Sequence, residues 1–134
     1  MLTREAAGEF PAGLYAAFAM LEHMPADQQR HVAGQLVVQF PSHAPAWELH
    51  ASFLEDPSDK LAAIERGLLA RPDPDTRGLL LVKKALALDA SGERQAALEI
   101  LDPLTSAVGD SPQTHVQACI AAAMIRSGRG GGTA

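Results

Sequence analysis

The sequence predicts an all-α fold in which antiparallel helical hairpins stack into a short array, and three observations favour it. Apolar residues make up 47% of the 134 residues, mainly as Ala and Leu, whereas aromatic residues, which sheets favour, make up only 4%. The apolar residues recur at helical spacing. Asp or Ser followed by Pro, a pair that suits a first helical turn, begins at Asp56, Asp73, Asp102 and Ser111.

The first hairpin is expected from two amphipathic segments. One spans about Pro11–His23, and the other begins at Pro25 and continues until Pro41 stops it. Each places three large apolar residues on one helical face: Leu14, Phe18 and Leu21 in the first, and Val32, Leu36 and Phe40 in the second.

The second hairpin is expected between Ala44 and Pro72. Its first helix, about Ala44–Glu55, has Trp47, Ala51 and Leu54 on one stripe. Asp56-Pro57 opens its second helix, and Arg71-Pro72 ends it, because the residue before proline avoids the helical region. The stripe of that second helix is formed by Leu61, Ile64 and Leu68.

The third hairpin, centred on Leu79–Leu101, is the clearest in the sequence: an apolar helix, a break and a second apolar helix. Its first helix opens at Asp73-Pro74 and is apolar over most of its circumference, so we expect it to be buried on more than one side. Ser91-Gly92 separates it from a helix that begins near Glu93. At Asp102-Pro103 two outcomes stay open: the helix ends near Leu101, or Pro103 kinks it.

A seventh helix is expected to open at Ser111-Pro112 and to form the end of one domain over residues 1–126. Residues 127–134, SGRGGGTA, are expected to be a flexible Gly-rich tail. Four apolar residues of this helix fall on one side: Val116, Ile120, Ala123 and Met124.

The hairpins recur at close to 34 residues, and the pattern resembles the tetratricopeptide repeat. Trp47, Ala51 and Leu54 occupy that family's first-helix positions. The third hairpin resembles it over both helices, at Leu81, Ala85, Leu88, Gly92, Ala97 and Leu101. The sequence departs from the family at His50 and Lys84, where Leu is preferred, at a short loop over Asp56–Ser58, and at Pro103. The resemblance implies a short right-handed α-solenoid of about three hairpins whose seventh helix is a solvating cap.

Charge and cysteine content disfavour several kinds of partner and site. A net charge of −5 disfavours nucleic acid and anionic membranes as partners. Cys119, the only cysteine, permits neither an intramolecular disulfide nor a four-cysteine zinc site within one chain. The first residues do not resemble a targeting signal and no apolar run is long enough to span a bilayer, so we expect a cytoplasmic protein.

Recognisable catalytic and ligand-binding motifs are missing from the sequence, so we expect a protein that is not an enzyme and needs neither a metal nor a cofactor. The five histidines fit no H-E-x-x-H pattern, and no nucleophile elbow or phosphate-binding glycine loop occurs. Cys119 lies in the apolar segment ACIAAAMI, where packing in the core is the expected role. A small metal-dependent hydrolase is the least favoured alternative.

We therefore expect a protein-binding scaffold or adaptor. The resemblance implies a concave groove lined by the first helix of each pair, and helical spacing exposes seven residues there: Glu48, Ser52, Glu55, Leu79, Val82, Leu86 and Asp89. Such a groove suits an apolar or basic segment of a partner protein. Capture of a C-terminal carboxylate is not favoured, because Glu48 and Ser52 stand where cationic residues would be needed.

Two alternatives stay open. Val82 and Leu86 could instead pack within the domain. The protein could also be a structural subunit that self-associates, through the apolar groove or the seventh helix.

Overall fold

The computed structural model describes residues 20–21, 23–109 and 111–128, and everything below refers to these residues. They form helices and no strand, which confirms the all-α prediction for this part of the chain. The predicted helix Pro11–His23 lies outside the described residues apart from Met20, Leu21 and His23, and so do residues 129–134 of the predicted tail. The six helices are α3 (Ala26–Gln39), α4 (Ala44–Ser52), α5 (Pro57–Leu69), α6 (Pro74–Ala90), α7 (Arg94–Ser106) and α8 (Pro112–Arg126).

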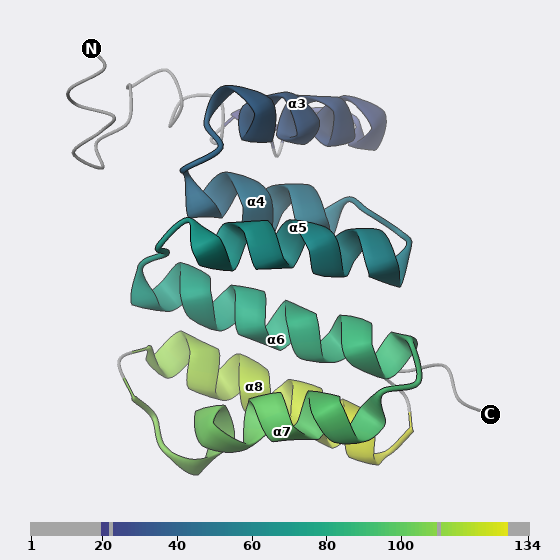
Figure 1. Ribbon diagram of the computed structural model, residues 1–134, viewed down its shortest axis with the longest axis vertical. Coiled ribbons are helices and arrows are strands. Elements are labelled where there is room, and N and C mark those ends of the chain that lie inside the picture. The colour runs from purple at the N-terminus through teal and green to yellow at the C-terminus, as the bar shows by residue number, and fades with distance from the viewer. Residues whose placement is uncertain (1–19, 22, 110, 129–134) are drawn as a thin grey trace.

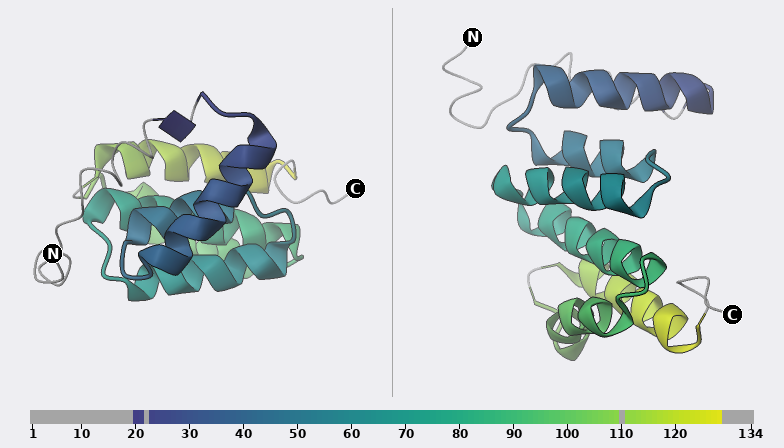
Figure 2. Two further views of the ribbon diagram at one scale, coloured as in Figure 1. Left: turned by 90° about the horizontal axis from the view of Figure 1, so that it is seen from above. Right: turned by 45° about the vertical axis from the view of Figure 1, so that its right-hand side comes forward.

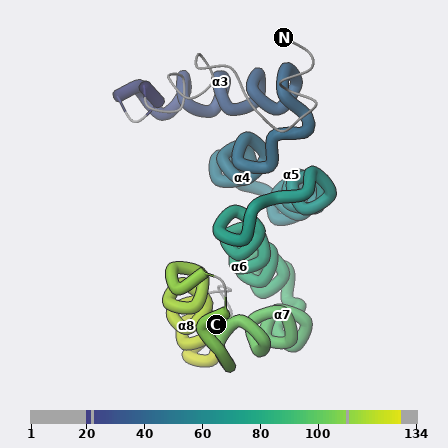
Figure 3. The backbone as a smooth tube through the Cα atoms, turned by 90° about the vertical axis from the view of Figure 1, so that its left-hand side faces the viewer, coloured from purple at the N-terminus to yellow at the C-terminus, as the bar shows by residue number. Residues whose placement is uncertain are grey.

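From α3 to α6 the helices follow one another along the long axis of the molecule, and successive helices of the chain run in opposite directions (Figure 1). Each helix packs on the next, while α6 also contacts α4 and α8. The rotated view in Figure 2 shows the same order of layers. In the tube of Figure 3, α7 and α8 lie side by side at the end of the stack opposite α3. α6 is therefore the central helix, as its apolar circumference predicts.

Three of the four expected Asp-Pro or Ser-Pro helix starts are confirmed. The side chains of Asp56, Asp73 and Ser111 each accept a hydrogen bond from the backbone N–H three residues later, at 3.1 Å, 3.1 Å and 3.2 Å. These bonds satisfy amides that have no partner within the helix. Because capping of this kind involves only neighbouring residues, it can be predicted from the sequence.

Asp102-Pro103 is the exception, because Pro103 lies inside α7 and begins no helix. Of the two outcomes left open there, an end of the helix near Leu101 is excluded, because α7 continues to Ser106. Leu104, in the turn after Pro103, packs against the core between α6, α7 and α8. That packing holds the last turn in place although proline contributes no N–H to it.

Two further helix ends differ little from expectation. α4 stops at Ser52 rather than Glu55, so Leu54 lies half-buried beyond the helix. The predicted break at Ser91-Gly92 is confirmed, and Gly92 has a φ of 89°, a left-handed conformation that glycine adopts without strain.

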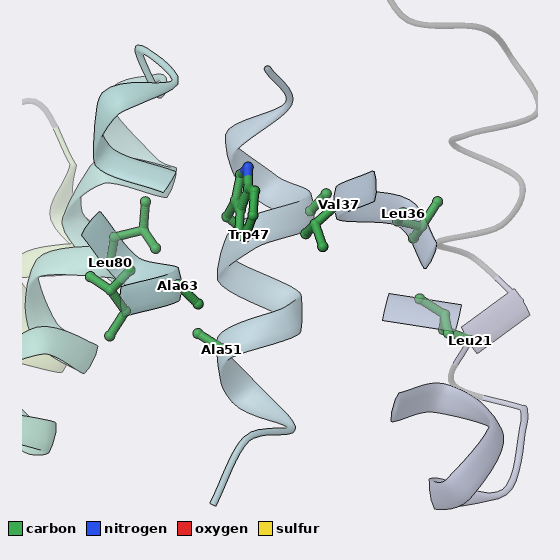
Figure 4. Packing of buried hydrophobic residues seen from close by; sticks show 9 residues of the cluster. Leu21, Leu36, Val37, Trp47, Ala51, Ala63 and Leu80 are labelled. Atoms are coloured by element: carbon green, nitrogen blue, oxygen red, sulfur yellow. The ribbon is translucent and has the colours of Figure 1, made fainter. Parts of the chain in front are cut away.

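The core consists of two clusters that meet at α6. The first cluster joins α3, α4, α5 and α6 around Trp47 and the fully buried Ile64 and Leu80 (Figure 4). Trp47 donates a hydrogen bond from Nε1 to the carbonyl of Pro41 at 2.8 Å, and the Arg66 guanidinium lies 4.8 Å from the centre of its ring. The second cluster is formed by Val82, Ala85, Ala97, Leu101, Ala118, Ala121, Ala122 and Ile125.

The apolar side expected on the last helix faces solvent. Val116, Ile120, Ala123 and Met124 are all exposed, and α8 instead buries Thr114, Ala118, Ala121, Ala122 and Ile125. The reason lies in α6: a Cβ atom at Gly78 would overlap the side chain of Thr114. A glycine facing a row of small residues lets the two helices approach closely, which the larger side chains of α8 would prevent.

Candidate functional site

The candidate site is a cavity of about 240 Å³ where the C-terminal end of α4 and the N-terminal end of α5 meet the second half of α6. It contains three of the predicted groove residues, Ser52, Glu55 and Leu86. The complete lining is Ala51, Ser52, Glu55, Pro57, Lys60, Ile64, Lys83, Leu86, Ala87 and Ala90.

The apolar part of this cavity is held by the core. Ile64 and Ala51 belong to the first core cluster and are buried, and Ala87 on α6 is buried as well. Leu86 is half-buried and packs against the second cluster. Because both clusters support these side chains, the cavity has an apolar wall that does not depend on a loop.

The charged residues around the cavity are paired with one another. Lys83 Nζ lies 3.4 Å from Glu48 Oε2, and Arg30 Nη2 lies 3.4 Å from Glu55 Oε2. The Lys60 ammonium donates a hydrogen bond to the carbonyl of Ala51 at 3.1 Å, near the C-terminal end of α4. Desolvation by burial lowers the pKa of Lys60, and the nearby charge of Lys83 lowers it further. Each of the two glutamates therefore has a cationic neighbour.

The remaining predicted groove residues do not line this cavity. Glu48 is half-buried and reaches the site only through its ion pair with Lys83. Leu79 is half-buried elsewhere on α6. Val82 and Asp89 are buried, only 5% and 7% exposed, so the expectation that they are exposed in a groove is wrong.

The reason is that α6 is covered on several sides. Val82 faces the second core cluster, and the alternative reading, in which it packs within the domain, is confirmed. Spacing along α6 could not distinguish these readings, since apolar residues surround most of that helix. Lys60, by contrast, lines the cavity but was not predicted from the sequence. The Asp56 cap explains why Lys60 lies at the start of α5, but it does not show that the Lys60 side chain faces the cavity.

Cys119 is exposed, so the expectation that it packs in the core is also wrong. Its Sγ lies 3.9 Å from His115 Nε2, and His115 Nδ1 lies 3.1 Å from the carbonyl oxygen of Leu104. The cause is again the orientation of α8, whose buried face is taken by alanines. Over residues 20–21, 23–109 and 111–128, the side chains of His, Cys, Asp and Glu form no group of three or more that could hold a metal ion.

A second hollow of about 240 Å³ lies between the start of α6, the end of α7 and the start of α8. Ser111 in this hollow is already engaged in capping a helix. The Ser111 hydroxyl donates to Asp75 Oδ1 at 2.5 Å and also caps α8. We therefore take the α4–α5–α6 cavity as the candidate site.

No protein-family model matches the chain, and comparisons with curated proteins and with solved structures find no match either. In the part of the chain that the structure describes, none of the helices has the length and apolar character needed to cross a membrane.

Proposed function

We propose that this protein is a non-catalytic interaction module, a short right-handed α-solenoid of tetratricopeptide-like hairpins that binds a segment of a partner protein. The observation that carries the proposal is the α4–α5–α6 cavity, with its apolar wall and its paired charges. An open apolar cavity on a helical scaffold suits a side chain from another chain better than it suits a reaction.

The size of the cavity supports an anchor of one or two side chains. Drug-sized ligands fill pockets of roughly 300 to 1,000 Å³, somewhat larger than this one. Burying one Leu, Ile or Met side chain from the partner stabilises the complex by about 1.5 to 3 kcal/mol. The rest of the affinity has to come from contacts around the cavity.

The charges favour an apolar anchor over a purely basic one. Glu48 and Glu55, which would attract a basic segment, each already interact with a cation. A partner segment with an aliphatic anchor and flanking residues of both signs would match the alternating Lys and Glu around the cavity.

To test the proposal, larger side chains are introduced at exposed residues that line the cavity, so that they compete with a bound peptide. Peptides are selected from a random library on the immobilised protein, and their Kd values are measured by isothermal titration calorimetry. Ser52→Trp and Ala90→Lys, both at exposed cavity residues, should weaken binding at least tenfold, which is about 1.4 kcal/mol.

The matched control is Ser58→Trp, an exposed serine on α5 outside the cavity lining. It should bind the same peptides with unchanged Kd. Circular dichroism should show equal helicity in all variants. Failure to select any peptide, or equal binding by Ser52→Trp, would contradict the proposal.

A further inference from the structure

The outward face of α8 is uncharged and carries an apolar stripe. Val116, Ile120 and Met124 are 55%, 52% and 40% exposed. The other exposed residues between Pro112 and Ile125 are also without charge: Pro112, Gln113, Gln117, Cys119 and Ala123. A helix that ends a stack ordinarily presents a polar outer face to water. On α8 the polar residues of that face are two glutamines, beside three large exposed apolar side chains.

The comparison with α6 shows what kind of surface it is. Both helices begin with an N-cap residue, a proline and then a buried threonine, so alignment of Asp73 with Ser111 pairs each α6 residue with the α8 residue 38 positions later. Gly78, Val82, Ala85 and Leu86 of α6 then correspond to Val116, Ile120, Ala123 and Met124 of α8.

On α6, these four positions are covered by the last two helices. Gly78 lies against Thr114 of α8, and Val82 and Ala85 are buried in the second core cluster, with Leu86 packed beside it. The exposed stripe of α8 is thus the same face that the preceding equivalent helix uses for helix packing. Val116 stands where α6 has Gly78, so a helix packed on this face of α8 would lie farther away than α8 lies from α6.

A second copy of α8 fits this stripe because the stripe is symmetric about its centre. Val116 and Met124 lie one helical turn before and after Ile120, so in an antiparallel pair of α8 helices Ile120 faces Ile120 and Val116 faces Met124. A two-fold interface requires this pattern, in which each contact occurs twice with the roles exchanged.

The charges agree with that occupant. The chain carries a net charge of −5, so two copies repel each other over most approaches. The outward face of α8 is free of charge between Pro112 and Ile125, and antiparallel helices oppose their dipoles favourably. We propose that the protein forms a two-fold dimer through the outward face of α8, centred on Ile120.

The dimer should be weak. A single helix face buries less than the roughly 800 Å² per partner of a standard stable interface, so we expect the dimer to dissociate measurably between about 10 µM and about 500 µM. The surface is separate from the peptide cavity, whose lining comes from α4, α5 and α6 alone. The dimer and the proposed function can therefore succeed or fail independently.

Sedimentation equilibrium from about 10 µM to about 500 µM tests the dimer. The unmodified protein should show a concentration-dependent monomer–dimer equilibrium. Ile120→Glu, and independently Met124→Lys, should raise the dimer Kd at least tenfold while circular dichroism stays helical, since both residues are exposed. Val38→Glu, on an exposed valine of α3 at the other end of the stack, is the matched control and should leave the equilibrium unchanged.

Cys119 provides a second readout, because it is exposed one residue from the centre of the contact. A short bismaleimide should link two copies of the unmodified protein and of Val38→Glu, but not of Ile120→Glu or Cys119→Ser. A strict monomer, a dimer that survives both Ile120→Glu and Met124→Lys, or a dimer lost in Val38→Glu, as head-to-tail association would produce, would each overturn the proposal.

Discussion

Asp73 shows how much of this fold rests on single side chains at helix starts. Its carboxylate accepts hydrogen bonds from the Thr76 backbone N–H at 3.1 Å and from the Thr76 hydroxyl at 2.6 Å. The hydroxyl bond is the largest cause of a pKa below the ordinary value for this carboxyl, and the backbone bonds act in the same direction. The cap thus prefers the ionised form of Asp73.

The pH dependence of this cap can be predicted. Because the folded state lowers the pKa of Asp73, its stabilisation is complete above the unfolded pKa near 3.8 and is lost as the pH falls through the folded pKa. Asp73→Ala should lower the free energy of unfolding by about 1 kcal/mol at pH 7, and by less at pH 3. Urea unfolding followed by circular dichroism measures both values.

Asp73→Asn is the control for that experiment, since an amide oxygen also caps helices but does not titrate. It should retain most of the stability at pH 7. An equal loss for Asp73→Ala at pH 7 and pH 3 would show that the cap does not depend on ionisation.

At the scale of the helix, α7 is the least regular element because it contains Pro103. A proline within a helix has no N–H to donate and crowds the carbonyl four residues earlier. Thr105 and Ser106 donate hydrogen bonds from their hydroxyls to the carbonyl of Asp102, at 3.1 Å and 2.7 Å. Side-chain hydroxyls thus satisfy one carbonyl in the last turn.

Pro103→Ala should stabilise the protein. The gain from the restored hydrogen bond exceeds the entropy that the unfolded chain regains, and we expect a net increase of about 1 to 2 kcal/mol in the free energy of unfolding. Urea denaturation measures it. Pro112→Ala, at the first position of α8 where proline costs nothing, should be neutral or slightly destabilising. A loss of stability in Pro103→Ala would contradict this prediction.

At the scale of the whole molecule, α6 joins the two core clusters. Leu80 points into the first cluster and Val82 and Ala85 belong to the second. Gly67 on α5 lets Leu80 pack closely, since a Cβ there would lie 3.1 Å from a Leu80 methyl carbon. One helix therefore connects the packing of α3–α5 with that of α7–α8.

Leu80→Ala should cost about 2 to 5 kcal/mol, because Leu80 is fully buried and its removal leaves a cavity between α5 and α6. Hydrogen exchange should show α4 and α5 losing protection before α7 and α8. Leu69→Ala, at a leucine that is 78% exposed, is the matched control and should change little. Equal loss of protection in all helices would indicate a single cooperative core.

The candidate site was predictable only in part. Ser52, Glu55 and Leu86 lie in the cavity as residues of the expected groove. Ser52 and Leu86 are on helices, as the spacing assumes, whereas Glu55 lies beyond the end of α4. Lys60 lines the cavity although it was not predicted, whereas Val82 and Asp89 were predicted to be exposed in the groove and are buried. Each of these outcomes depends on contacts between helices that are distant in the sequence.

The helix starts at Asp56, Asp73 and Ser111 and the break at Gly92 could be predicted from the sequence. Capping, proline geometry and apolar periodicity involve only a few adjacent residues, so local sequence is enough to predict them. Which faces of α6 and α8 are covered depends instead on contacts between helices. α6 is apolar almost all round, so its spacing permits several orientations, and the close approach of Gly78 to Thr114 selects one. In that orientation Val82 is buried, whereas Cys119 and Ile120 are exposed.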